Sequence, residues 1–97
     1  MRKFEITNTE GGAALVIRLV KGAERDEVIG KEDDIVRINL TVTGDKIEVD
    51  RYLVNFLSEM LGVPPERIAT TSGKSEDKQM AIVMGMTPAI IEKRLFL

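Results

Sequence analysis

The side chains that could carry chemistry in this chain are carboxylates, amines, guanidinium groups and hydroxyls, because the sequence contains neither histidine nor cysteine. That composition excludes a Ser-His-Asp triad, a cysteine nucleophile and a zinc site built from imidazole or thiolate. Three carboxylates, Asp45, Glu48 and Asp50, crowd the start of the most strongly patterned segment. Two such groups facing one cleft can act as general acid and base or hold a divalent cation. They are the candidate acidic site of an alternative function, a carboxylate- or metal-dependent hydrolase.

The same residues also have a purely structural explanation. Asp45 and Glu48 have the spacing of a capping box, and acidic groups at a helix start interact favourably with the helix dipole. A second acidic run, Glu32-Asp33-Asp34, lacks the alternating ligand spacing and the glycine of a calcium loop. We therefore predict no catalytic residue, cofactor or metal site, and favour a non-enzymatic binding module.

Basic residues provide the other candidate site. Four of them fall in predicted loops that could converge on a ligand: Lys21, Arg25, Lys74 and Lys78. RNA or a nucleoprotein is one partner class for them, and a protein is the other. Acidic residues are interleaved with these positions, and the predicted open sheet face has no aromatic ring on which a base could stack. The segment Ser72–Ser75 contains Gly-Lys but precedes a strand, so it predicts a hairpin turn and not a phosphate-binding loop.

Composition limits the class of protein further. The chain has 97 residues, 43% of them hydrophobic and 31% charged, which fits one globular domain over residues 1–97. The net charge of -2 argues against a general binder of polyanions. The absence of cysteine fits a reducing compartment, so we expect a cytoplasmic protein. No apolar run is long enough to span a bilayer, and the apolar end Leu95–Leu97 suggests a monomer or a weak homodimer.

The central helix has the clearest signal. Apolar residues recur at three- and four-residue intervals and predict one buried stripe, formed by Val49, Tyr52, Leu53, Phe56, Leu57, Met60 and Leu61. Gly62 suits the left-handed residue that follows a helix, and Pro64-Pro65 forbids its continuation. A second helix is expected from Thr87 as cap and Pro88 as first residue, with Ile90, Ile91 and Leu95 on its apolar side.

Alternating residues predict the strands. The expected strands are 3–7, 13–20, 35–42, 67–71 and 78–84, with a brief extended piece at 28–29. Together with the helices they predict an α+β fold in two layers, a mixed or antiparallel sheet of four to five strands with both helices on one face. On the last strand we expect Met80 and Met84 to pack under the helices, and Gln79 to lie on the solvated face with Lys3, Glu5, Arg18, Arg37, Asn39 and Thr41.

Several segments resemble the YggU-like family of uncharacterised small α+β proteins. They are VIRLVKGAERDEVIG, VRINLTV, FLSEMLGVPPERI, SGKSEDK and MAIVMG, and the resemblance covers the chain roughly from Leu15 to Gly85. The most specific pieces are Gly22–Glu27, Leu61–Pro64, and Ser72-Gly73 followed by Lys78. The resemblance implies a ββαββα order with a mixed sheet in two layers. Its basic positions imply a nucleic-acid role only weakly.

The chain departs from the family pattern at the start of the central helix. Family members usually carry Gly-Lys-Ala-Asn there, whereas this chain has Ile47-Glu48-Val49-Asp50. An acidic segment therefore replaces a basic one that contains glycine, and a ligand role carried by those family residues is not expected to transfer.

Overall fold

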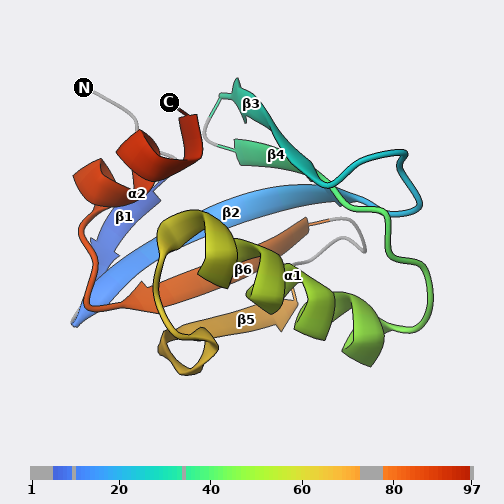
Figure 1. Ribbon diagram of the computed structural model, residues 1–97. Helices are drawn as coiled ribbons and strands as arrows, with labels where there is room; N and C mark the ends of the chain where they lie inside the picture. Colours follow the sequence, from blue (N-terminus) through green and yellow to red (C-terminus); the bar gives the residue numbers. More distant parts are fainter. Residues whose placement is uncertain (1–5, 10, 34, 73–77, 97) are drawn as a thin grey trace.

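The computed structural model describes residues 6–9, 11–33, 35–72 and 78–96 (Figure 1). The elements follow the order β1 (Ile6–Thr9), β2 (Gly12–Val20), β3 (Glu27–Glu32), β4 (Ile35–Asn39), α1 (Lys46–Leu61), a 3-10 turn (Pro65–Arg67), β5 (Ile68–Ser72), β6 (Lys78–Met84) and α2 (Pro88–Phe96). Among these described residues, no helix is long and apolar enough to cross a membrane.

One mixed sheet forms the first layer. Its strand order is β3-β4-β2-β6-β5. The short strand β1 pairs with the first half of β2, and β4 pairs with the second half. The pairing of β2 with β4 is parallel, and the other pairings are antiparallel. The first two strands form an antiparallel hairpin, and the predicted two-layer α+β class is confirmed. The predicted extended piece at 28–29 is part of a full strand, β3, which has a register shift between Val28 and Gly30.

The two helices form the second layer and contact one another on the same face of the sheet (Figure 1). The Arg94 guanidinium of α2 donates to the carbonyl oxygen of Leu61 at 2.5 Å, so a cation from the second helix satisfies an orphan carbonyl at the end of α1. On the other side of α2, Glu92 pairs with Lys31 of β3. These contacts attach α2 both to α1 and to an edge of the sheet.

The predicted ends of α1 are confirmed. The Asp45 carboxylate accepts from the Glu48 amide at 2.9 Å, and the Glu48 carboxylate accepts from the Asp45 amide at 3.4 Å, which completes the capping box. Gly62 follows the helix at φ 73, where a β-carbon would be strained, and its amide donates to the Ser58 carbonyl. Both ends of the helix are therefore encoded locally.

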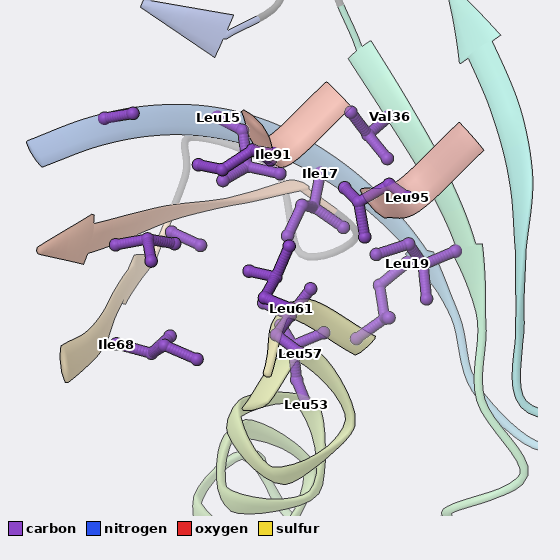
Figure 2. Packing of buried hydrophobic residues seen from close by; sticks show 14 of the residues in the cluster. Leu15, Ile17, Leu19, Val36, Leu53, Leu57, Leu61, Ile68, Ile91 and Leu95 are labelled. Carbon is purple, nitrogen blue, oxygen red and sulfur yellow. The ribbon is translucent and has the colours of Figure 1, made fainter. Parts of the chain in front are cut away.

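The core lies between the helices and the sheet (Figure 2). Alternate residues of β2 and every third or fourth residue of α1 meet there, and the side chains of Leu15, Ile17, Leu53, Leu57 and Leu61 are fully buried. Burial of each such side chain contributes about 1.5–3 kcal/mol relative to leaving it exposed. This aliphatic contact fixes α1 on the sheet. From α2, Ile91 and Leu95 are buried in the core and Phe96 packs against it, whereas Ile90 is 41% exposed, so the expectation for Ile90 is wrong.

The orientation of β6 is opposite to the one predicted. Gln79, Ala81 and Val83 face the helices, whereas Met80 and Met84 are 39% and 43% exposed on the other face. The sequence of this strand fits either orientation, because the odd-numbered and the even-numbered residues both include apolar side chains. A register shift by one residue would exchange which of the two sets faces the helices. The smaller side chains of Ala81 and Val83 fill the space under the helices, and Gln79 finds a partner on α1. The methionine that does become buried is Met86, in the segment that connects β6 to α2.

Candidate functional site

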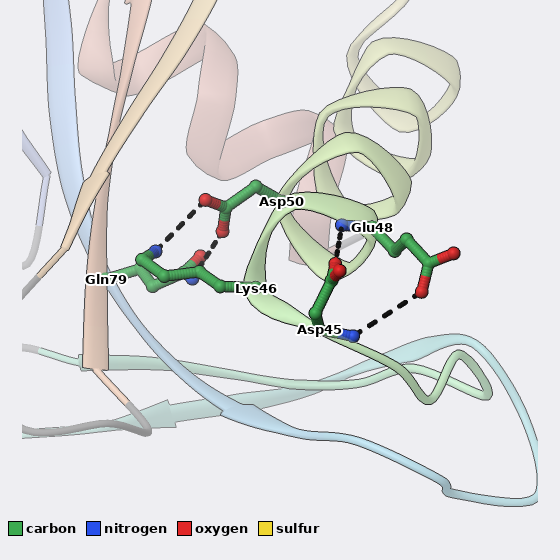
Figure 3. Close-up of polar contacts among 5 residues, drawn as sticks. All are labelled: Asp45, Lys46, Glu48, Asp50 and Gln79. Carbon is green, nitrogen blue, oxygen red and sulfur yellow. Dashed lines mark hydrogen bonds and ion pairs between the residues drawn. The ribbon is translucent and has the colours of Figure 1, made fainter.

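The three carboxylates predicted as an acidic site do not act together in the structure (Figure 3). Asp45 and Glu48 bond each other's backbone amides in the capping box. Asp50 points from α1 toward the sheet, where one oxygen accepts from the Gln79 amide at 2.6 Å and the other from the Lys46 ammonium at 3.0 Å. Within the described residues, no three acidic, histidine or cysteine side chains gather in a way that could hold a metal ion.

Gln79 is the unusual residue of this region. Only 6% of it is exposed, and its side-chain nitrogen donates to Asp50. Its side-chain oxygen is buried and has no hydrogen-bond partner in the part of the chain that the structure describes. A buried carbonyl without a partner costs about 1–3 kcal/mol. The Asp50–Gln79 contact is therefore a polar link between α1 and β6 that is only partly satisfied.

The predicted basic residues lie toward one end of the sheet. Lys21 and Arg25 are exposed in the connection from β2 to β3, Lys78 begins β6 opposite Arg18 of β2, and Lys74 lies outside the described residues. Both described loop residues follow the end of β2, and the start of β6 lies beside that same end. The described three thus share one end of the molecule.

An acidic residue of the same loop has a structural role. The Asp26 carboxylate accepts from the Tyr52 hydroxyl at 2.6 Å and from the Thr41 amide at 2.7 Å. These hydrogen bonds, that of Tyr52 first, lower the pKa of Asp26 below its ordinary value. The Tyr52 ring packs against the core while its hydroxyl bonds Asp26 at the edge, which attaches the β2–β3 loop to α1.

The uncovered face of the sheet carries a feature that the sequence did not reveal. Arg18 of β2 is paired with Arg37 of β4 on one side and with Lys78 of β6 on the other. Since paired residues of neighbouring strands project to the same face, three cations stand side by side across the central strands, opposite the helices. We call this row, Arg37–Arg18–Lys78, the basic row. Only the strand pairing brings it together, because its members are far apart in the sequence.

Apolar side chains continue the same face beyond the basic row. Val16 of β2 pairs with Met80 of β6, and the alternate residues Ile82 and Met84 follow along β6. Val16 and Ile82 are half-buried, and both methionines are exposed. We call these four residues the apolar strip. In the described part of the chain both helices lie on the opposite face, so the half-buried basic row and the apolar strip form one amphipathic surface on the side of the sheet away from the helices.

A search against protein-family models finds no family that matches this chain.

Proposed function

We propose that this protein is a non-enzymatic binding module whose ligand docks on the uncovered face of the sheet. The observation that carries the proposal is the basic row beside the apolar strip. Exposed apolar residues that adjoin each other, next to charged ones, are typical of interaction surfaces. The three cations outnumber the two carboxylates, Glu27 and Glu32, that β3 contributes to the same face, and would give it a preference for anionic groups.

The use of the acidic residues supports a non-enzymatic role. Asp45 and Glu48 stabilise the start of α1, Asp50 is engaged by Lys46 and Gln79, and Asp26 holds the β2–β3 loop. Each of these carboxylates has a structural partner. None of them faces a second carboxylate in the way that paired acid–base catalysis requires.

RNA or a nucleoprotein is one ligand class for this module, through Lys21, Arg25, Lys74 and Lys78. Lys78 belongs both to this set and to the basic row, so the two surfaces would be continuous. Binding of a mixed-sequence RNA oligonucleotide should then fall steeply as salt rises, because phosphate contacts release counterions. No binding at low salt would eliminate RNA as the ligand.

The test of the module is a mapping of ligand contacts combined with an activity screen. Amide shifts in two-dimensional NMR should change on β2, β4 and β6 when anionic peptides or RNA are added, and should stay constant on the exposed side of α2. A hydrolase screen with and without Mg²⁺ or Mn²⁺ should find no turnover. Turnover that is lost in Asp50→Asn would overturn the binding-module proposal.

One observation favours the second candidate, a carboxylate- or metal-dependent hydrolase. The buried Gln79 oxygen has no partner among the described residues, and it belongs to the residue that holds Asp50. A donor or a cation bound there would satisfy both groups. In that case Asp50→Asn should abolish activity, and activity that persists in the variant would remove the candidate.

Two wider proposals accompany this function. The first is kinship with the YggU-like family, which the order of the elements and the turn Leu61–Pro64 after α1 support. The second is a cytoplasmic location, which the absence of cysteine supports.

A further inference from the structure

We infer that the ligand of the uncovered face is an acidic amphipathic helix of a protein partner, about 14 residues long. The inference rests on the binding module proposed above and specifies its partner. It follows from the length, the charge and the chemistry of the surface, and each of these is set by the strand pairing.

The length comes from β6. From Lys78 in the basic row to Met84 at the end of the apolar strip, the strand advances by six residues, or about 20 Å at 3.4 Å per residue. A helix that lies along this strand rises 1.5 Å per residue, so about 14 residues, or nearly four turns, cover the surface. A helix of this length presents one continuous stripe to the sheet, as α1 does on the opposite face.

Charge complementarity selects an acidic end for that helix. Adjacent members of the basic row stand on neighbouring strands, about 4.8 Å apart. Carboxylates three positions apart on the first turn of the helix project to different sides of its axis, so they can reach toward cations on neighbouring strands. Arg37 lies 3.5 Å from Glu32 in an exposed pair, which contributes little and is readily exchanged for a partner carboxylate.

The apolar strip selects a hydrophobic stripe behind the acidic end. Met80 and Met84 are flexible and polarisable, and such side chains adapt to the aliphatic and aromatic residues of a docked helix. Val16 and Ile82 provide a flatter surface beside them. Apolar residues at i, i+3, i+4 and i+7 of the partner would cover all four.

The same chemistry disfavours the other occupants. The described part of this face carries no aromatic ring, whereas sheet surfaces that bind single-stranded RNA stack bases on such rings. A second copy of the chain, related by a two-fold axis through this face, would bring the basic rows of both copies into one interface. An acidic helix avoids that repulsion.

The probe is a fluorescent peptide of about 14 residues, with glutamates at one end and leucines at the other, all on one helical face. It is titrated with the full chain at low and at high salt. The controls are the peptide with glutamine in place of glutamate, a scrambled peptide and a mixed-sequence RNA oligonucleotide. We expect the acidic peptide to bind best, more weakly at high salt, with amide shifts along β2 and β6.

Paired variants localise the binding. Lys78→Gln and Met84→Ser should each weaken it about fivefold, as expected for an exposed ion pair and for a partly buried methionine. Their matched controls are Lys93→Gln and Ile90→Ser on α2, since Ile90 is exposed to nearly the same extent as Met84. The controls should leave the affinity unchanged, and circular dichroism should show that all four variants are folded.

Three results would overturn the inference. If the RNA oligonucleotide shifts this face and the acidic peptide does not, the partner class is wrong while the binding module stands. If sedimentation shows a dimer that Met84→Ser dissociates, the occupant is a second copy. If neither the peptide nor the RNA perturbs the face, an acidic helix is excluded as the ligand. If the hydrolase screen then finds turnover that depends on Asp50, the binding-module proposal is wrong as well.

Discussion

The two faces of the sheet are built from the same strands, yet they differ in chemistry. The helix-covered face is aliphatic, with Gln79 as its only buried polar residue among those described, and the uncovered face combines three cations with exposed methionines. Hydrophobicity alone does not explain this division, since Gln79 is inside and its neighbour Met80 outside. The side that each β6 residue faces depends on whether its side chain fits the space beneath the helices and, for Gln79, on the hydrogen bond to Asp50 of α1. The covered face is therefore specified by packing, and the uncovered face is the one that we propose for ligand binding.

The largest expected effect contrasts two residues of β2. Ile17→Ala removes a fully buried side chain from the covered face and should lower the free energy of unfolding by about 2–5 kcal/mol. Val20→Ala, on the uncovered face and 44% exposed, should cost less than about 1 kcal/mol. Urea denaturation measures both. Equal losses would mean that the uncovered face packs against something and is not free for a ligand.

The next contrast uses adjacent residues of β6. Gln79→Ala removes the charge-assisted hydrogen bond to Asp50, worth about 2 kcal/mol, but also the unpartnered buried oxygen, so the net cost should be about 1 kcal/mol. Met80→Ala should change stability by less than about 0.5 kcal/mol, because Met80 is exposed. The same denaturation measurement applies. A larger loss for Met80 than for Gln79 would contradict the assignment of the two faces.

Local signals made the helices and most strands predictable. The stripe of α1, its capping box and Gly62 each involve residues within a few positions of one another, so the sequence displays them directly. The strand pattern of β2 is equally local, and its alternate residues Leu15, Ile17 and Leu19 are the buried ones.

The candidate surface could not be predicted in the same way. The basic row exists only because β2 pairs with β4 in parallel and with β6 in the register Arg18–Lys78, and pairing of distant strands leaves no local pattern. The orientation of β6 was ambiguous because Ala81 and Val83 alternate with Met80 and Ile82. The long-range contact between Asp50 and Gln79, which accompanies the observed orientation, also leaves no trace in the spacing.

A third prediction separates stability from recognition. Asp45→Ala removes the side chain that accepts from the Glu48 amide, and should lower the free energy of unfolding by about 1 kcal/mol. Because Asp45 belongs to the helix layer, binding of the acidic peptide should be unchanged. Lys78→Gln should show the reverse, weaker binding with nearly normal stability. Calorimetric unfolding measures the stability of both variants, and the peptide titration measures their binding. If Asp45→Ala weakens binding, the stability of the helix layer and recognition by the uncovered face are not independent.

The smallest effect concerns the contact at the edge between the layers, where Tyr52 of α1 donates to Asp26. Tyr52→Phe removes this bond at an exposed position and should cost less than about 1 kcal/mol at neutral pH. The pKa of Asp26 is lowered in the folded chain, so its contribution is present above the ordinary value of 3.8 and is lost as the pH falls through the lower folded value.

The difference between wild type and Tyr52→Phe should therefore shrink on acidification, whereas the difference made by Ile17→Ala persists because no titrating group is involved. Urea denaturation at neutral pH and near pH 3 measures this. In an Asp26→Asn background, where the carboxylate is absent, the effect of Tyr52→Phe should no longer depend on pH. If it still does, a group other than Asp26 titrates against Tyr52, and the Asp26 carboxylate is not the source of the pH dependence.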